Sequence, residues 1–336
     1  MNRLRRIRAL RLAGRGRGWL VAAALALVVS AVFKPTVVWQ RPRFEHVVVL
    51  DVTQSMNVAD MRLDGAPASR LAYAKHALRA ALLQLPCGSK VGWAIFTEYR
   101  SFLLLAPLEV CAHLDELRAS LAQIGTPMAW AGNSEIAKGV HSALGIAKAL
   151  PGTPSLVFIT DGQEAPPLSP RFRPSFDDKP GEVAGLIVGV GDTRPVPIPK
   201  LDPAGRPLGF WRADEVMQTD PRAQGRGGSV QSETMADDGA VHGTPTAAGA
   251  SLGATPGTEH LSALREGYLR LLAGEQGLGY LRLDATPGLA VAWRAPAFER
   301  LAPAEVDARV ALAVVALLAL LAHYAVPWLR RTPRDA

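Results

Sequence analysis

The sequence predicts an α/β fold, with a doubly wound, mostly parallel sheet, helices on both of its faces and one antiparallel edge hairpin. Apolar, strand-like segments alternate along the chain with segments whose apolar residues recur at helical spacing, a pattern typical of parallel sheets. Two of these strands run directly into an aspartate, Asp51 and Asp161. Two further strands are separated only by residues 98–101, and so short a connection indicates a hairpin.

Six strands and four helices are expected between residues 44 and 285. The strands cover residues 44–52, 90–97, 102–106, 155–160, 185–190 and 279–283, and the helices cover 69–85, 113–124, 134–150 and 259–273. The first helix has the clearest pattern, because Ser69 is a favourable N-cap and Leu71, Ala74 and Leu78 fall on one face.

A long insertion is expected to interrupt this domain at residues 192–258. Its first part is rich in proline, and residues 222–258 are mostly Gly, Ala, Ser and Thr, so the segment can bury little and should be partly mobile. The expected organisation is therefore a basic N-terminus and anchor at 1–43, an α/β domain at 44–285, a linker at 286–308, and a C-terminal transmembrane helix with a basic tail at 309–336.

The net charge of +7 comes from the two ends of the chain. Residues 1–18 contribute +7 and residues 330–336 contribute +2, which leaves −2 for the middle. This distribution gives no basic face for nucleic acid. The arginines instead flank two apolar segments, 19–33 and 310–326, which we expect to be transmembrane helices. A cleaved signal peptide and a buried core helix are the respective alternatives.

The position of the arginines predicts the topology. Both clusters lie on the far side of the apolar segments from the domain, so the positive-inside tendency puts both termini in the cytoplasm and the domain outside it. The two cysteines, Cys87 and Cys111, lie just before the second strand and just after the third. A hairpin brings them to the same end of the sheet, where a disulfide is sterically feasible, although two free buried thiols fit the count equally well.

Oxygen-bearing side chains follow several of the predicted strands. Asp51, Thr53 and Ser55 leave the first strand, Ser134 begins the third helix, and Asp161 ends the fourth strand. The carboxyl ends of parallel strands share one edge of the sheet, which is where such sheets bind ligands. Two carboxylates and three hydroxyls suit a divalent cation, Mg²⁺ above all, with Ca²⁺ and Mn²⁺ as alternatives. A single aspartate at a strand end is equally a common turn former.

These segments resemble the von Willebrand factor A domain and its metal-ion-dependent adhesion site. The resemblance rests on HVVVLDVTQSM, GNSEIAKG, SLVFITDG and LIVGVG and covers about two thirds of the chain. It implies that Asp51, Thr53, Ser55, Ser134 and Asp161 bind the metal, and that a partner protein supplies an acidic side chain to its open coordination position. Thr53 and Ser134 stand where the family more often has serine and threonine, so the hydroxyl chemistry is kept.

The layout with two anchors resembles the Bat-type membrane proteins of bacteria. The phrases LPCGSKVGWAIFTEYRSFLLLAP, WAGNSEIAKG and FITDGQEAPP are more specifically similar to the MxaL family of A-domain proteins, which are encoded with methanol dehydrogenase in methylotrophs. That resemblance implies an accessory role in assembling the periplasmic dehydrogenase, including calcium insertion, for a protein of the bacterial inner membrane. A Bat-like role in envelope stress, or aerotolerance, is the alternative.

The motifs of several enzyme classes are missing from the sequence. The histidines form no HExxH, there is no GxSxG or GxxxxGK, and LDVTQS lacks the second aspartate of a DxDx phosphatase loop. We therefore expect a protein that is not an enzyme, and keep a metal-dependent hydrolase using Asp51 as the alternative of another class. Tyr99 and Trp130 are candidate partner contacts near the metal face, or loop residues that pack on the domain.

Overall fold

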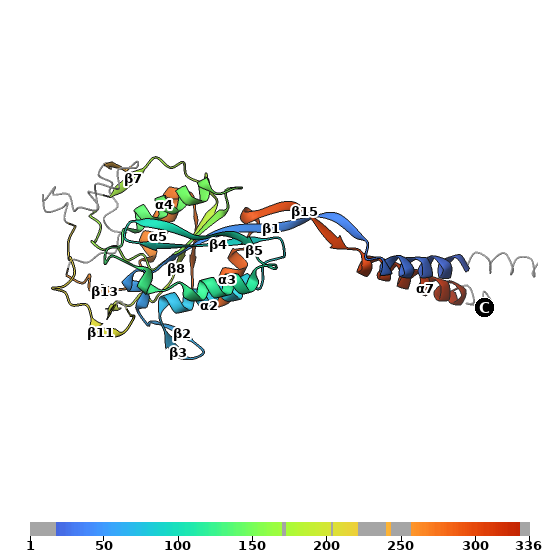
Figure 1. Ribbon diagram of the computed structural model, residues 1–336, viewed down its shortest axis with the longest axis horizontal. Coiled ribbons are helices and arrows are strands. Elements are labelled where there is room, and N and C mark those ends of the chain that lie inside the picture. Colours follow the sequence, from blue (N-terminus) through green and yellow to red (C-terminus); the bar gives the residue numbers. More distant parts are fainter. Residues whose placement is uncertain (1–17, 170–172, 203, 221–239, 243–256, 330–336) are drawn as a thin grey trace, which may run out of the picture. The chain divides into compact units, whose positions relative to one another are not determined.

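The computed structural model describes residues 18–169, 173–202, 204–220, 240–242 and 257–329. The basic N-terminus, the basic tail after residue 329 and most of the predicted mobile segment at 222–258 lie outside these residues. The chain divides into two compact units, one formed by residues 42–300 and the other by the two ends of the chain, residues 1–41 and 301–336. The larger unit holds the α/β fold (Figure 1).

The centre of the larger unit is a seven-stranded sheet whose main path runs β14-β8-β6-β1-β4-β5, with β15 also paired to β1. These strands are β1 (Thr36–Asp51), β4 (Lys90–Thr97), β5 (Arg100–Glu109), β6 (Ser155–Thr160), β8 (Gly185–Gly189), β14 (Gly279–Arg282) and β15 (Glu299–Asp307). Along the main path every pair is parallel except β4 with β5, which form an antiparallel hairpin at one edge. The predicted mostly parallel sheet with one edge hairpin is confirmed.

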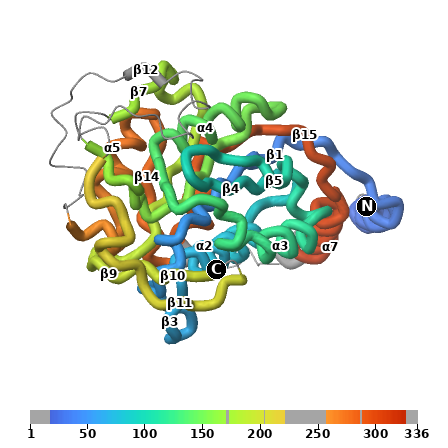
Figure 2. The backbone as a smooth tube through the Cα atoms, turned by 60° about the vertical axis from the view of Figure 1, so that its left-hand side comes forward, coloured from blue at the N-terminus to red at the C-terminus, as the bar shows by residue number. Residues whose placement is uncertain are grey.

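Helices cover both faces of this sheet (Figure 2). Alternate residues of β1 point to opposite faces: Val48 and Leu50 belong to one buried cluster, Val47 and Val49 to the other. The first cluster contains side chains of α2 (Arg70–Leu82), α3 (Leu114–Gln123) and α6 (Thr286–Ala292), and the second those of α4 (Ile136–Ala149) and α5 (Glu266–Gln276). As predicted, Ser69 is the N-cap of α2, where its side chain accepts a hydrogen bond from Ala72 N.

Two segments differ from expectation. The helix predicted from residue 259 begins only at Glu266, because Leu261–Ser262 (β13) pairs with Val196–Pro197 (β9), and the Arg265 amide donates to Asp161 O at 2.9 Å. The first part of the expected linker, residues 286–300, belongs to the larger unit, where Trp293 of this segment is fully buried. Helix α6 is too short to show a helical period in the sequence.

The insertion begins with short paired strands rather than with irregular chain. After β9, strands β10 (Pro199–Leu201) and β11 (Pro207–Phe210) form an antiparallel pair. Four further short strands form two antiparallel pairs among the described residues: β2 (Met61–Leu63) pairs with β3 (Ala66–Ala68), and β7 (Pro174–Phe176) pairs with β12 (Ala240–His242). At the end of the sheet opposite Asp51, the structure joins Cys87 and Cys111 in a disulfide.

The smaller unit contains a helix over residues 18–32 and α7 (Arg309–Leu329). Ala24 and Ala316 are buried, and Ala308 N donates to Pro35 O at 2.9 Å. These helices lie where the two transmembrane segments were predicted. Within the part of the chain that the structure describes, no helix has both the length and the apolar character needed to cross a membrane.

One buried histidine makes the stability of the larger unit depend on pH. His46 of β1 is fully buried, its ring lies 5.2 Å from that of Trp293 and 5.7 Å from that of Phe298, and its Nε2 is 3.1 Å from Trp293 O. Burial lowers the pKa of His46 from 6.5 to about 4. The unfolded chain therefore takes up this proton at a higher pH than the native protein does.

We predict that the buried, neutral His46 makes its full contribution to the free energy of unfolding above pH 6.5, and that this contribution is lost as the pH falls toward 4. By pH 5 the loss should reach about 2 kcal/mol. The variant His46→Phe removes the titrating group but keeps an aromatic ring. The difference in free energy of unfolding between wild type and variant, from urea titrations, should therefore change by about 2 kcal/mol from pH 7.5 to 5. A constant difference across this range would contradict the buried, neutral histidine.

Candidate metal centre

The register of two central strands brings the candidate site together. Leu50 of β1 pairs with Ile159 of β6 in a parallel register, so Asp51 and Thr160 end their strands side by side. The Thr160 hydroxyl donates a hydrogen bond of 2.6 Å to Asp51 Oδ2. Asp161, the next residue, is fully buried like Asp51. The two predicted carboxylates thus lie at one edge of the sheet.

Each carboxylate forms the turn that leads the chain away from its strand. Asp51 Oδ1 accepts hydrogen bonds from Thr53 N at 2.9 Å and from the Thr53 hydroxyl at 2.6 Å. Asp161 Oδ1 accepts one from Gln163 N at 2.9 Å. Both are the aspartate turns that the sequence also allowed. The first turn brings Ser55 Oγ to 3.4 Å from Thr53 Oγ1, so the three residues of the first loop converge.

A buried arginine neutralises Asp161, and the sequence did not indicate it. Arg70, the first residue of α2, is fully buried, and its Nη1 donates to Asp161 Oδ2 at 2.5 Å and to Ser262 Oγ at 2.6 Å. Its Nη2 donates to Asp60 Oδ2 at 2.6 Å. Burial disfavours the charged guanidinium, but Asp161 and Asp60 outweigh that cost and raise the pKa of Arg70.

Ser134 is positioned by its backbone and has a free hydroxyl. Its N–H donates to Ala165 O at 2.7 Å, its carbonyl accepts from Ala165 N at 2.8 Å, and the next amide, of Glu135, donates to Glu98 O at 2.6 Å. The residue is 3% exposed, and its Oγ makes no hydrogen bond to any described residue. Burying a hydroxyl without a hydrogen-bond partner is energetically costly. Ser134 Oγ is therefore a candidate ligand for a cation.

A cavity of about 190 Å³ collects the predicted residues that carry hydroxyls. Thr53, Ser55 and Ser134 line it together with Ile198, Trp211, Glu215 and Met217 of the insertion and with Glu259, which directly follows the insertion. The indole N–H of Trp211 donates to the Gln54 side chain, which fixes this wall next to the first loop. Trp211 therefore packs the insertion down on the candidate site.

The electrostatics of the site favour a cation. Burial, followed by repulsion from Asp161, raises the pKa of Asp51 to about 7, although hydrogen bonds from Thr160 and Thr53 oppose the rise. A divalent cation close to both carboxylates would offset both effects by stabilising their ionised forms. The described residues contain no group of three or more His, Cys, Asp or Glu side chains suited to a metal. A cation here would therefore depend on hydroxyl as well as carboxylate oxygens, as Mg²⁺ does well.

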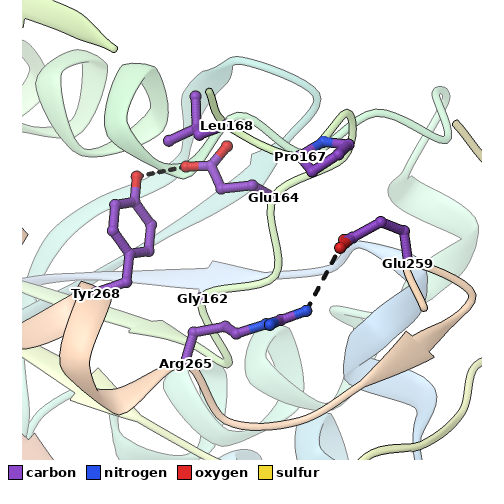
Figure 3. A pocket seen from close by; sticks show the side chains of 7 residues that line it. All are labelled: Gly162, Glu164, Pro167, Leu168, Glu259, Arg265 and Tyr268. Atoms are coloured by element: carbon purple, nitrogen blue, oxygen red, sulfur yellow. Dashed lines mark hydrogen bonds and ion pairs between the residues drawn. The ribbon is translucent and has the colours of Figure 1, made fainter. Parts of the chain in front are cut away.

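A smaller pocket adjoins the site through the loop after Asp161 (Figure 3). Glu164 accepts a 2.5 Å hydrogen bond from the Tyr268 hydroxyl, and burial raises the pKa of this carboxyl to about 8. Arg265 lies 3.8 Å from Glu259, which lines both this pocket and the larger cavity. At about 10 Å³ the pocket holds no more than a water molecule, so we assign it a packing role.

The candidate partner contacts lie in two neighbouring loops. Trp130 is 58% exposed, its indole N–H donates to Glu98 Oε2 at 3.0 Å, and its ring meets that of Phe102 edge-on at 4.9 Å. Tyr99 is partly exposed, with the Arg100 guanidinium 5.6 Å from its ring centroid. Neither residue lines the larger cavity, so both stay candidate contacts outside it.

We predict that Arg70→Met lowers the free energy of unfolding by about 3–5 kcal/mol, because it leaves Asp60 and Asp161 buried without their counter-charge. Saturating Mg²⁺ should restore part of the loss if the site holds a cation. Urea denaturation with and without Mg²⁺ measures both effects. Arg62→Met is the matched control, because Arg62 is exposed and should change stability by about 0.5 kcal/mol at most. A loss for Arg70→Met as small as that of the control would contradict the role of Arg70.

Comparison with solved structures finds several chains of low sequence identity. An aerotolerance-related membrane protein from Bacteroides fragilis, with multiple mutations to serines, is 18% identical, with a TM-score of 0.46, and the match covers 76% of this chain and 98% of that one. BatB from Bacteroides thetaiotaomicron, a conserved hypothetical protein, is 16% identical, with a TM-score of 0.45 and coverage of 75% and 95%. No curated protein matches the chain.

The family comparison concerns the part of the chain that carries the candidate site. Residues 46–163 match the model of the von Willebrand factor type A domain. The match begins in β1 and ends just after Asp161, so it includes all five predicted metal residues. Together with the mostly parallel sheet, the match supports a fold like that of the von Willebrand factor type A domain for this part of the chain.

Proposed function

We propose that the domain binds a divalent cation through Asp51, Thr53, Ser55, Ser134 and Asp161 and recognises a partner protein's acidic side chain through it. The observation that carries the proposal is the unpartnered Ser134 Oγ in a cavity that Thr53 and Ser55 also line. The cation supplies a positive charge that an incoming carboxylate can approach. Mg²⁺ fits this donor set best, with Ca²⁺ and Mn²⁺ as alternatives.

The chain's own residues prepare the site for this role. Asp51 and Asp161 are each held in place by a turn, because each accepts a hydrogen bond from an amide two residues on. Arg70 leaves Asp161 with reduced negative charge, which weakens the repulsion between the carboxylates before a cation arrives. Nothing in this arrangement calls for a general base or a nucleophile, so binding rather than catalysis is the proposed activity.

We further propose that the domain works in the bacterial periplasm. The domain would be held at the inner membrane by its terminal segments, as an accessory factor for the assembly of methanol dehydrogenase and the insertion of its calcium. The Cys87–Cys111 disulfide supports an oxidising compartment, and the arginine-flanked ends support membrane attachment. The dehydrogenase itself is supported only by the sequence phrases that resemble the MxaL family.

We predict that Mg²⁺ raises the melting temperature of the wild-type protein and not that of Asp51→Asn. A ligand that binds only the native state stabilises that state, and Mg²⁺ at about one hundred times its Kd would add about 2.7 kcal/mol to the free energy of unfolding. Asp64→Asn is a matched control, because Asp64 is exposed and has a φ of 50°, a conformation that asparagine tolerates. Equal Mg²⁺ shifts for wild type and Asp51→Asn in a thermal melt would rule out the predicted site.

We further predict that deleting the gene in its native host lowers the calcium content and activity of periplasmic methanol dehydrogenase. Metal analysis of the purified dehydrogenase checks this, and complementation with Asp64→Asn but not Asp51→Asn should restore calcium. Normal calcium in the deletion strain would reject the assembly role, and a defect confined to oxidative stress would favour the envelope-stress alternative. Turnover of a phosphate ester that vanishes in Asp51→Asn would indicate a hydrolase instead.

A further inference from the structure

Glu259 carries a buried carboxylate oxygen that no described residue satisfies. The residue directly follows the insertion and is 3% exposed. Its Oε2 accepts a 3.1 Å hydrogen bond from the Gln163 side-chain amide, whereas its Oε1 has no hydrogen-bond partner in the described part of the chain. A buried charged group that is only partly paired costs free energy, so this oxygen is suited to a ligand that donates a hydrogen bond.

This carboxylate borders the cavity of about 190 Å³ but is separate from the two aspartates of the candidate metal centre. Glu259 lines the cavity, and neither Asp51 nor Asp161 does. A single water molecule needs only about 10–15 Å³ of such space. The cavity can therefore admit a side chain or a small molecule that reaches Glu259 without contacting the aspartates.

Apolar side chains form much of the cavity wall. Four of them belong to the insertion, and they are Ile198, Trp211, Val216 and Met217. A ligand in this cavity would meet apolar surface as well as the carboxylate of Glu259. An alkyl chain that ends in a positive charge matches both features, because the methylene groups of lysine-like chains cover apolar surface while the charged end binds elsewhere.

The other glutamate on the cavity wall already has its partners. Glu215 Oε1 accepts from Lys200 Nζ at 2.8 Å, and Oε2 accepts from Arg212 N at 3.1 Å. The Arg265 guanidinium approaches Glu259 Oε2 only to 3.8 Å. Burial raises the pKa of Glu259 despite this cation and the hydrogen bond from Gln163. Of the two acids, Glu259 is therefore the one whose charge is incompletely compensated.

The single unused oxygen also selects the kind of cation. A guanidinium group binds a carboxylate best through two parallel hydrogen bonds, one to each oxygen. Gln163 already occupies Oε2 of Glu259, which leaves Oε1. An ammonium group is a compact charge that can donate to one oxygen alone, so it fits this arrangement better than a guanidinium group.

We propose that this cavity binds a primary alkylammonium group, with the charge at Glu259 Oε1 and the alkyl chain against Ile198, Val216 and Met217. The inference goes beyond the proposed function, because Glu259 is not one of the five residues assigned to the metal. A lysine side chain of a partner protein and a free alkylamine share this chemistry, and the experiment distinguishes them.

The test is a titration of the full-length protein, without added metal, with n-butylammonium chloride, which reproduces the end of a lysine side chain. The indole N–H signal of Trp211 in NMR spectra reports binding, because Trp211 lines the cavity. We expect saturable binding of n-butylammonium, weaker binding of n-butylguanidinium, and no saturable binding of 1-butanol, which lacks the charge.

Two variants assign the charge to Glu259. Glu259→Gln keeps the size of the side chain but removes its charge, and should weaken n-butylammonium binding about tenfold or more. Glu215→Gln is the matched control on the same wall and should leave the affinity within about twofold. If Glu259→Gln does not fold, the comparison of n-butylammonium with 1-butanol in wild type still tests the requirement for charge.

Three results would overturn the inference: no saturable binding to wild type, equal binding of 1-butanol, or equal affinity losses in Glu259→Gln and Glu215→Gln. Nα-acetyl-lysine methylamide distinguishes the two sources. Binding as tight as that of n-butylammonium would support a lysine side chain of a partner, and binding of n-butylammonium alone would support a free amine. Mg²⁺ binding is tested separately with Asp51→Asn, so either proposal can fail without the other.

Discussion

The structure of the candidate site depends on the placement of two buried carboxylates at neighbouring strand ends. Asp51 ends one strand and Asp161 follows another that is adjacent and parallel to it, so the sheet brings two buried carboxylates close together. The protein meets this cost with hydrogen bonds from Thr53 and Thr160 to Asp51 and with the Arg70 guanidinium on Asp161. The compensation is incomplete, since the pKa of Asp51 is raised to about 7. Because loss of the proton from Asp51 remains unfavourable, a cation that binds here would stabilise the ionised carboxylate.

Much of this could be read from the sequence, because it follows from local pattern and from the geometry of parallel sheets. The alternation of strands and helices predicted that Asp51, Ser134 and Asp161 leave the same edge. The short connection between β4 and β5 predicted a hairpin, and the hairpin brought Cys87 and Cys111 together. These inferences need only strand direction and order. They do not require knowledge of which side chains touch.

The residues that the sequence did not reveal are those whose role comes from contacts between distant segments. Arg70 begins an amphipathic helix and has the pattern of an exposed residue, yet it contacts Asp60, Asp161 and Ser262 from three separate parts of the chain. Glu259 was expected to begin a helix, but it lies in a turn that leads into β13, which pairs with β9. Helical periodicity carries no information about either long-range contact.

The placement of the insertion gives the site a property that the A-domain core alone lacks. A cation held only by the loops after β1 and β6 and by Ser134 would face solvent on its open side. Here Trp211 is bonded to Gln54 of the first loop, and Glu259 is bonded to Gln163 of the loop after Asp161. A residue of the insertion and the residue directly after it are thus hydrogen-bonded to two of the loops that carry the candidate site. If the domain acts as proposed, a partner that reaches a cation here would have to move these contacts, which would couple recognition of the partner to the conformation of the insertion.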